Sequence, residues 1–223
     1  MIKIENVDVY GWEAAIRGMR NPMNSWKLSD SIPGKDSFYV GVGDFDLMKR
    51  LVSAGPDHGK FMRFIGVTVD ITAPLYWWKE FDTYKVGTVA NSCSTMHKIH
   101  AKEFTLGDFS HEHLVDLVPY NDWLLCNSLI HLKDTIARLN YWRDKYLEMP
   151  TEGGSNGMTK KDVWWQMIQL LPSSYNQKRT VLLNYEVLRH MYKARKNHKI
   201  DEWRNLCKWI ETLPYAELIT MEG

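Results

Sequence analysis

The stretch from Pro74 to Lys98, PLYWWKEFDTYKVGTVANSCSTMHK, holds the side chains best suited to bind a ligand. Its first half carries aromatic residues at three- and four-residue steps, which predicts a helix beginning near Pro74. Its second half, from Gly87 to Thr95, is rich in hydroxyl groups and backbone N–H groups, which can hold a phosphate or a sugar. A Ser/Thr-rich connection without a ligand explains the same composition, and composition alone favours that alternative.

Three further residues could contribute to such a site. Arg195 follows an apolar helical face, where a guanidinium can bind a phosphate or carboxylate through two parallel hydrogen bonds. The alternative is a solvated arginine at a helix C-terminus, and a charged helix face explains the nearby Arg189 and Lys193. Asn184 stands between apolar residues, so its amide needs a partner in a ligand or in neighbouring backbone. His58, in a Gly-Pro-Asp-His-Gly loop, could stack on a planar ring or donate to a phosphate, although most loop histidines face solvent.

Other reactive side chains are less well placed. His111 and His113 form a His-x-His pair, but no third ligand is spaced to complete a metal site. Cys93 near His97 could act as a nucleophile, although a buried or loop thiol is the simpler interpretation. The chain has no glycine-rich dinucleotide motif, no Walker loop and no nucleophile elbow.

The run from Thr83 to Met96 resembles a degenerate copy of the signature of the flavin-dependent thymidylate synthases. That signature is Arg-His-Arg, two residues, Ser, one residue, Asn, two residues, Ser, one residue and Arg. Thr83, Tyr84 and Lys85 stand where Arg-His-Arg would be, and Thr88 supplies the first hydroxyl. The resemblance implies that Thr83, Tyr84 and Lys85 contact FAD. Tyrosine still offers a stacking face, whereas lysine is a point charge that cannot bind a diphosphate through a fork.

The rest of the signature is matched once one residue is inserted near Ala90. Asn91 and Ser94 then fall on the Asn and the second Ser, and the resemblance implies that both contact the substrate nucleotide. Met96 falls on the final Arg, and Ile168 stands where the family has another nucleotide-binding Arg. Each lost charge-assisted contact should weaken binding by about 1.5–3 kcal/mol. Cations elsewhere could compensate, and the sequence offers three for this role: Arg63, Lys85 and Lys98.

Two other segments resemble the same family in the same order. The stretch from Leu170 to Trp203 matches its second half, in which a Pro, Asn184 and Arg195 are separated by 12 and 11 residues. The resemblance assigns Asn184 to the cofactor and Arg195 to the substrate nucleotide. The earlier stretch from Ala54 to Pro74 resembles the family's His-containing loop and core strand, and it assigns His58 to the cofactor.

Together these matches run from about Ala54 to Trp203, and the chain resembles a divergent member of the flavin-dependent thymidylate synthase family. The resemblance implies an α+β fold with a central antiparallel sheet flanked by helices. It also implies reductive methylation of dUMP or a related pyrimidine nucleotide, with FAD as cofactor and methylenetetrahydrofolate and NADPH as co-substrates, in a homotetramer. No catalytic residue is assigned. Two alternatives stay open: a catalytically degenerate nucleotide- or flavin-binding protein of the same fold with a regulatory or interaction role, and an unrelated helical protein.

The composition predicts a single domain over residues 1–223. Hydrophobic residues make up 44% and charged residues 25%, and a formal net charge of +1 provides no bulk attraction for nucleic acid or membranes. Ten Trp and eleven Tyr must line a core, a subunit contact or a flat ligand, which also favours a homo-oligomer. Three widely spaced cysteines support neither a disulfide framework nor a zinc knuckle. A charged N-terminus and the lack of a membrane-length apolar run make the cytoplasm the expected location.

Hydrophobic periodicity gives the expected elements. Period-two alternation predicts strands at residues 2–10 and 62–71. Helical spacing predicts further helices at residues 13–20, 44–54, 121–147, 159–171, 180–195 and 201–212. Asp44 is expected to cap the second of these helices, and Thr159 with Asp162 to form a capping box at the fourth. Residues 24–43, 87–95 and 152–159 are expected to be loops.

Overall fold

The computed structural model describes residues 2–34, 38–116, 127–150 and 157–222. Contacts between residues divide them into two compact units. The sheet unit holds Ile2–Ile71, Glu80–Asn91 and residues 179–222, and the helical unit holds Thr72–Lys79 and the described part of Ser92–Lys178. Two such units can belong to one domain, so a single domain over residues 1–223 stays a prediction. No helix in the described part of the chain is long and apolar enough to cross a membrane.

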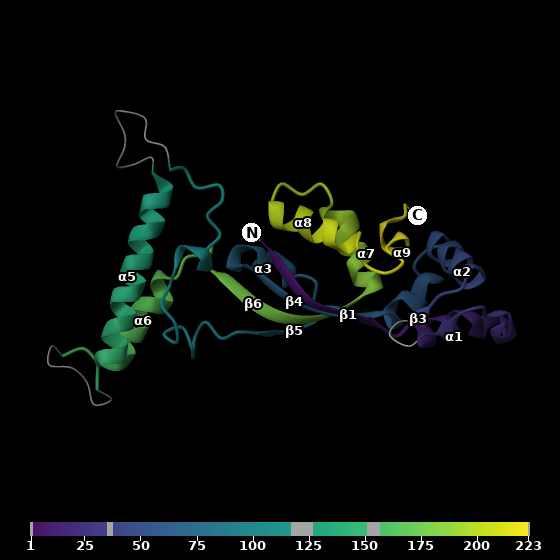
Figure 1. Cartoon of the computed structure of the whole chain (residues 1–223), viewed down its shortest axis with the longest axis horizontal. Coiled ribbons are helices and arrows are strands. Elements are labelled where there is room, and N and C mark those ends of the chain that lie inside the picture. The colour runs from purple at the N-terminus through teal and green to yellow at the C-terminus, as the bar shows by residue number, and fades with distance from the viewer. Residues whose placement is uncertain (1, 35–37, 117–126, 151–156, 223) are drawn as a thin grey trace. The chain divides into compact units, whose positions relative to one another are not determined.

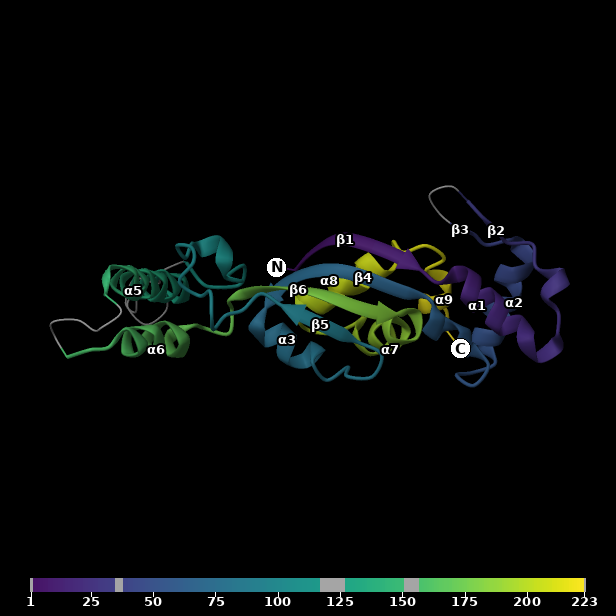
Figure 2. The ribbon, with the colours of Figure 1, turned by 90° about the horizontal axis from the view of Figure 1, so that it is seen from below.

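A four-stranded antiparallel sheet in the order β1-β4-β6-β5 lies mainly in the sheet unit (Figures 1 and 2). Its strands are β1 (Lys3–Tyr10), β4 (Gly66–Pro74), β5 (Val89–Ser92) and β6 (Asn176–Asn184). The apolar face predicted for β4 is confirmed, since Val67, Val69 and Ile71 are at most 1% exposed. Asp70 of β4 accepts hydrogen bonds from Asn6 of β1 (2.8 Å) and from Thr180 of β6 (2.6 Å), which ties the three strands together.

Helices flank this sheet, and Figure 1 shows α7 and α8 on the same face of it. The C-terminal helices are α7 (Tyr185–Arg195), α8 (Asp201–Ile210) and α9 (Glu217–Thr220). The N-terminal part supplies α1 (Trp12–Arg20), α2 (Val42–Ser53), the short antiparallel pair β2 (Ile32–Pro33) and β3 (Phe38–Tyr39), and the 3₁₀ helices η1 (Asn21–Met23), η2 (Trp26–Leu28) and η3 (Gly59–Phe64). Fully buried side chains such as Leu188, Trp203 and Leu206 fill the core of this unit.

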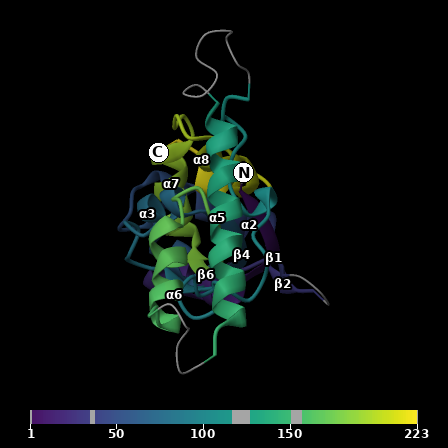
Figure 3. The same ribbon diagram turned by 90° about the vertical axis from the view of Figure 1, so that its left-hand side faces the viewer.

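The helical unit is built on α5 (Ser128–Glu148) and α6 (Lys160–Leu170), which pack side by side (Figure 3). It also holds the 3₁₀ helix η4 (Leu106–Asp108) and most of α3 (Leu75–Phe81). The apolar stripe predicted for α5 is confirmed at Leu132, Ile136 and Leu139, which are buried in one cluster with Met167 of α6. Residues 121–126 of the expected helix and residues 152–156 of the expected loop lie outside the described residues.

The predicted capping box of α6 is confirmed. The Thr159 hydroxyl accepts a hydrogen bond from the backbone N–H of Asp162 (3.2 Å), and the Asp162 carboxylate accepts from the backbone N–H of Thr159 (2.8 Å). The reciprocal bonds satisfy donors that a helix start leaves without intrahelical partners.

The predicted helix over residues 180–195 is wrong in its first part. Residues 176–184 form β6, and the helix α7 begins at Tyr185. Val181 and Leu183 are at most 1% exposed while Leu182 between them is 36% exposed, which is the period-two burial of a strand. A short apolar run fits both periodicities, and pairing between β4 and β5 decides for the strand.

Three further features differ from the predictions. The strand expected from Met62 begins at Gly66, because residues 59–64 form η3, and part of the loop expected over residues 87–95 is β5. Asp44 is not the N-cap of α2, which begins at Val42. The carboxylate of Asp30 takes the capping role instead, accepting from the backbone N–H groups of Gly43 (2.8 Å) and Asp44 (3.0 Å).

Candidate functional site

Two of the predicted ligand residues, Tyr84 and Arg195, meet in the sheet unit although they lie 111 positions apart in the sequence. Arg195, in the last turn of α7, donates from Nε to the Tyr84 hydroxyl (3.0 Å) and from Nη1 to Glu80 Oε2 (2.8 Å). Its guanidinium carbon lies 4.6 Å from the ring centroid of Trp203, so the cation is also stacked on an indole. We call this group, together with His198, the Arg195 cluster.

Glu80 is the member of the cluster that sequence reasoning missed. Its Oε2 accepts from Arg195 Nη1 and from Trp203 Nε1, each at 2.8 Å, and lies 3.7 Å from His198 Nε2. The carboxylate therefore balances the charge of Arg195 within the protein. One feature of the sequence could have indicated this role. Glu80 lies three residues before Thr83, and a carboxylate so close to an expected phosphate-binding motif would repel a phosphate unless a cation of the protein balanced it.

Asn184 is the N-cap of α7. Its Oδ1 accepts a hydrogen bond from the backbone N–H of Val187 (3.0 Å), and its NH₂ group can donate to a ligand. Gly87 packs directly against this cap, with a φ of +76°, and a Cβ at that position would lie 3.0 Å from Asn184 Nδ2. The turn after Tyr84 and the start of α7 are therefore held in close contact.

The other residues assigned to the cofactor lie near Tyr84 in sequence or on a separate loop. The Thr83 hydroxyl donates to the backbone carbonyl of Glu80 (2.7 Å). Lys85 is exposed and forms no ion pair among the described residues. His58 is exposed immediately before η3, and its side chain makes no hydrogen bond in the described part of the chain.

The residues assigned to the substrate are divided between the units. Asn91 is exposed on β5 and belongs to the sheet unit, whereas Ser94 belongs to the helical unit. The Ser94 hydroxyl accepts from the backbone N–H groups of Met96 (3.2 Å) and His97 (2.9 Å), so it stabilises a local turn. Among the described residues, no group of three His, Cys, Asp or Glu side chains is arranged to hold a metal ion.

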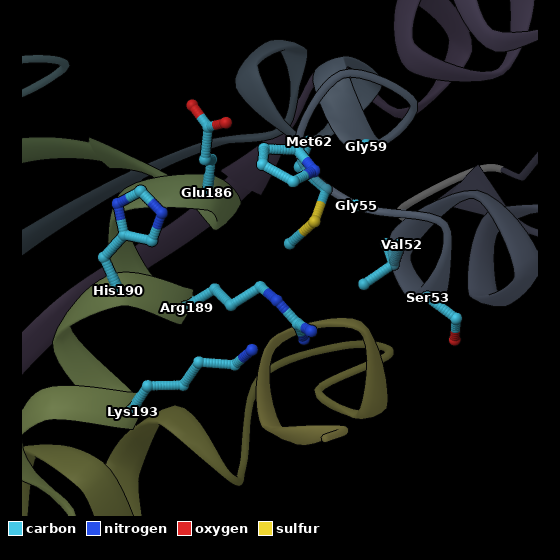
Figure 4. A pocket seen from close by; sticks show the side chains of 10 residues that line it. Val52, Ser53, Gly55, Gly59, Met62, Glu186, Arg189, His190 and Lys193 are labelled. Carbon is cyan, nitrogen blue, oxygen red and sulfur yellow. The ribbon is translucent and has the colours of Figure 1, made fainter. Parts of the chain in front are cut away.

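A cavity of about 150 Å³ opens beside α7 (Figure 4). Arg189 and Lys193 extend from α7 side by side toward Val52 and Ser53, whereas the Glu186 carboxylate points away from them (Figure 4). The interpretation of Arg189 as part of a solvated face is wrong, because its side chain is buried in the sheet unit. The remaining residues that line the cavity are Gly55, Pro56, Gly59, Met62 and His190.

The expected fold class, an antiparallel sheet flanked by helices, is confirmed, and solved structures of flavin-dependent thymidylate synthases match it. Thymidylate Synthase X (ThyX) from Helicobacter pylori, solved with FAD and dUMP, matches with a TM-score of 0.64 and 14% identity over 100% of this chain and 98% of its own. A second ThyX structure from Helicobacter pylori, complexed with FAD and dUMP, matches with a TM-score of 0.63 and 14% identity over 98% of each chain.

A third match carries a different name. The UMP/dUMP methylase PolB from Streptomyces cacaoi, bound with 5-Br dUMP, matches with a TM-score of 0.56 and 15% identity over 99% of this chain and 95% of its own. No protein-family model and no curated protein sequence matches the chain. At such identities the likeness establishes a shared fold.

Proposed function

We propose that the chain binds dUMP or a closely related pyrimidine nucleotide and methylates it reductively. The observation that carries this proposal is the direct hydrogen bond between Tyr84 and Arg195. Each residue was singled out independently by resemblance to the flavin-dependent thymidylate synthases, and the fold brings both into one cluster. Structures that share this fold over nearly the full length of both chains were solved with dUMP or 5-Br dUMP, which supports a pyrimidine nucleotide as ligand.

In this proposal the chain's own residues bind and orient the nucleotide. Arg195 supplies a guanidinium from the last turn of α7, Tyr84 supplies a hydroxyl, and Asn91 of β5 supplies an amide. Because Glu80 already balances Arg195, this cluster is suited to a neutral base edge as well as to an anion.

FAD is the proposed cofactor, and the described residues fit its ring better than its diphosphate. Tyr84 offers a planar face, Asn184 offers an amide NH₂ group, and His58 offers a ring whose nitrogens have no hydrogen-bond partner among the described residues. Lys85 supplies one exposed ammonium, which can contact a phosphate but cannot bind two of them through a fork. A bound flavin would supply the electrons for reductive methylation, and methylenetetrahydrofolate and NADPH are the proposed co-substrates.

The decisive experiment is a titration with FAD followed by an assay for dTMP formed from dUMP, methylenetetrahydrofolate and NADPH. Saturable flavin binding and dTMP formation are expected, and the purified protein should be yellow if flavin is retained. Arg195→Ala should weaken dUMP binding by about tenfold to a hundredfold, the value of one charge-assisted contact, while Arg50→Ala on the exposed face of α2 should not. Equal effects from the two variants would contradict the assignment of Arg195.

A second candidate function is nucleotide or flavin binding without methylation, in a regulatory or interaction role. The ion pair between Glu80 and Arg195 favours it, because a compensated guanidinium stabilises developing negative charge less than a free one. Binding of dUMP and FAD without any dTMP formation would select this candidate.

We also propose that the protein is a homo-oligomer, with a tetramer as the expected form. Exposed apolar side chains on three strands of the sheet support a subunit contact there: Val7, Tyr10, Val89 and Leu182. Light scattering at micromolar concentration tests this, and a monodisperse monomer would contradict it. The cytoplasmic location stays a prediction.

A further inference from the structure

We propose that the cavity beside α7 is a binding site for a phosphoryl group, held by Arg189 and Lys193. This site goes beyond the proposed nucleotide site, because it is formed by α7, the end of α2 and residues 55–62, whereas the Arg195 cluster is formed by α7, residues 80–84 and residues 198–203.

The first argument is the state of Arg189. Its side chain is 8% exposed, and only its Nη1 has acceptors, the backbone carbonyls of Leu218 (3.0 Å) and Ile219 (3.3 Å). Among the described residues no carboxylate lies within ion-pair distance of it, and its Nε and Nη2 have no acceptor. Burial lowers the pKa of Arg189, and no neighbouring carboxylate opposes that effect. A buried cation without a counter-charge is unfavourable, so an anion bound beside Arg189 would stabilise the protein.

The second argument is the surplus of positive charge around the cavity. Lys193 lies four residues after Arg189, on the same face of α7, and forms no ion pair in the described part of the chain. Glu186 is the acidic residue in the cavity lining, but both of its carboxylate oxygens accept from Arg63, and Figure 4 shows it turned away. His190 adds a ring that can donate a further hydrogen bond. Buried Arg189 and exposed Lys193 therefore both face the cavity without a carboxylate partner among the described residues.

The third argument is the match of size and charge to a phosphoryl group. A volume of about 150 Å³ admits a small anion, and Val52, Pro56 and Met62 form an apolar wall that strengthens electrostatic contacts inside it. A phosphoryl group carries up to two negative charges and three acceptor oxygens, which match one guanidinium and one ammonium, whereas a carboxylate would balance only one of them.

Isothermal titration calorimetry with inorganic phosphate tests the site. The wild-type protein should bind phosphate saturably, and Lys193→Met should weaken that binding by about tenfold to a hundredfold because it removes one charge-assisted contact. Lys208→Met is the matched control, since Lys208 is an exposed lysine on α8 without a partner among the described residues, and it should leave phosphate binding unchanged. The loss caused by Lys193→Met should persist in an Arg195→Ala background, in which phosphate can no longer bind to Arg195.

Competition in the Arg195→Ala protein identifies the source of the phosphoryl group. Displacement of phosphate by dUMP but not by deoxyuridine assigns the site to the phosphate of a nucleotide, and no displacement by dUMP assigns it to free phosphate or another phosphate ester. Absence of saturable phosphate binding to the wild-type protein, or equal affinity in the wild-type and Lys193→Met proteins, would overturn the proposal.

Discussion

Arg20 and Arg189 are two buried arginines of the sheet unit that differ in one respect. Both are more than nine-tenths buried, at 5% and 8% exposure, and both donate to a pair of backbone carbonyls. Arg20 also binds the carboxylate of Asp44, with Nη2 at 2.6 Å from Oδ1. Arg189 has no such partner among the described residues.

The difference separates a structural cation from one that needs a ligand. Asp44 accepts hydrogen bonds from Ser29 and Ser31 as well as from Arg20, so the charge of Arg20 helps to fix the segment between α1 and α2. The cavity beside Arg189 offers no equivalent carboxylate in the described part of the chain. A buried charge that the fold does not balance is therefore a better guide to a binding site than a position matched by resemblance alone.

The largest expected loss of stability comes from removing the carboxylate that balances Arg20, which leaves Arg20 without a counter-charge as Arg189 is among the described residues. Asp44→Ala leaves Arg20 buried without a counter-charge and should lower the free energy of unfolding by about 3–5 kcal/mol. Urea denaturation measures this loss. Asp46→Ala on the same helix removes a solvent-exposed ion pair with Lys49 and should cost less than about 1 kcal/mol. Equal losses would show that Asp44 does not stabilise Arg20.

Acid should remove part of the same stabilisation. Burial raises the pKa of Asp44, but hydrogen bonds from Ser29, Ser31 and Arg20 lower it more, so its pKa in the folded state lies below the ordinary value of 3.8. Such a carboxyl group stabilises the fold fully above its unfolded pKa, and this contribution is lost as the pH falls through the folded pKa. The difference in unfolding free energy between wild type and Asp44→Asn should be constant above about pH 5 and narrow below about pH 4. A difference unchanged down to pH 3 would contradict this.

Substituting each arginine in turn should show that Arg20 contributes more to the stability of the fold than Arg189 does. Arg20→Met leaves Asp44 buried without its cation and should cost about 3–5 kcal/mol. Arg189→Met removes two hydrogen bonds to carbonyls, but it also removes a buried charge that no carboxylate balances, so a net loss of about 1–2 kcal/mol is expected in phosphate-free buffer. Denaturation of the two variants in parallel measures both values. A loss at Arg189 as large as that at Arg20 would mean that Arg189 is structural.

The smallest effect is expected from removing the partly exposed ion pair between Arg195 and Glu80. Glu80→Gln should tighten dUMP binding by up to about fivefold, because a partly solvated ion pair is worth at most about 1 kcal/mol. Binding of deoxyuridine should not change, because it carries no phosphate. Glu217→Gln, an exposed charge on α9, is the control for altered net charge. Weaker dUMP binding in Glu80→Gln would show instead that Glu80 contacts the ligand.

The sequence predicted the parts of the fold that local pattern controls. The apolar residues of β4 follow only a period of two, and those of α5 follow only a helical period. Neither pattern fits the other kind of element, and both predictions were confirmed. The last residues of β6, 180–184, were predicted as helix because an apolar run of three residues fits either period, and only the neighbouring strands in the sheet distinguish the two. Asp30, which caps α2 from 13 and 14 residues away, gives no local signal at all.

The candidate site was predicted as far as resemblance reaches. Tyr84 and Arg195 were both singled out, and the structure brings them into contact. Glu80 was missed because its role depends on a partner 115 residues later in the chain. Arg189 was misread because an arginine on a helix with several charged neighbours suggests solvent, and its burial depends on segments packed around α7, including α9.

The ribosome synthesises the backbone carbonyl groups that accept hydrogen bonds from Arg189 after it has synthesised Arg189 itself. Leu218 and Ile219 follow it by 29 and 30 positions, which is roughly 1.5–6 seconds of synthesis at about 5–20 residues per second. During that interval α7 has no acceptors for the guanidinium. A nascent chain interrupted before residue 218 would carry every side chain that lines the cavity and still lack the contacts that orient its central cation. The orientation of Arg189 is therefore among the last features of the cavity to form on the ribosome.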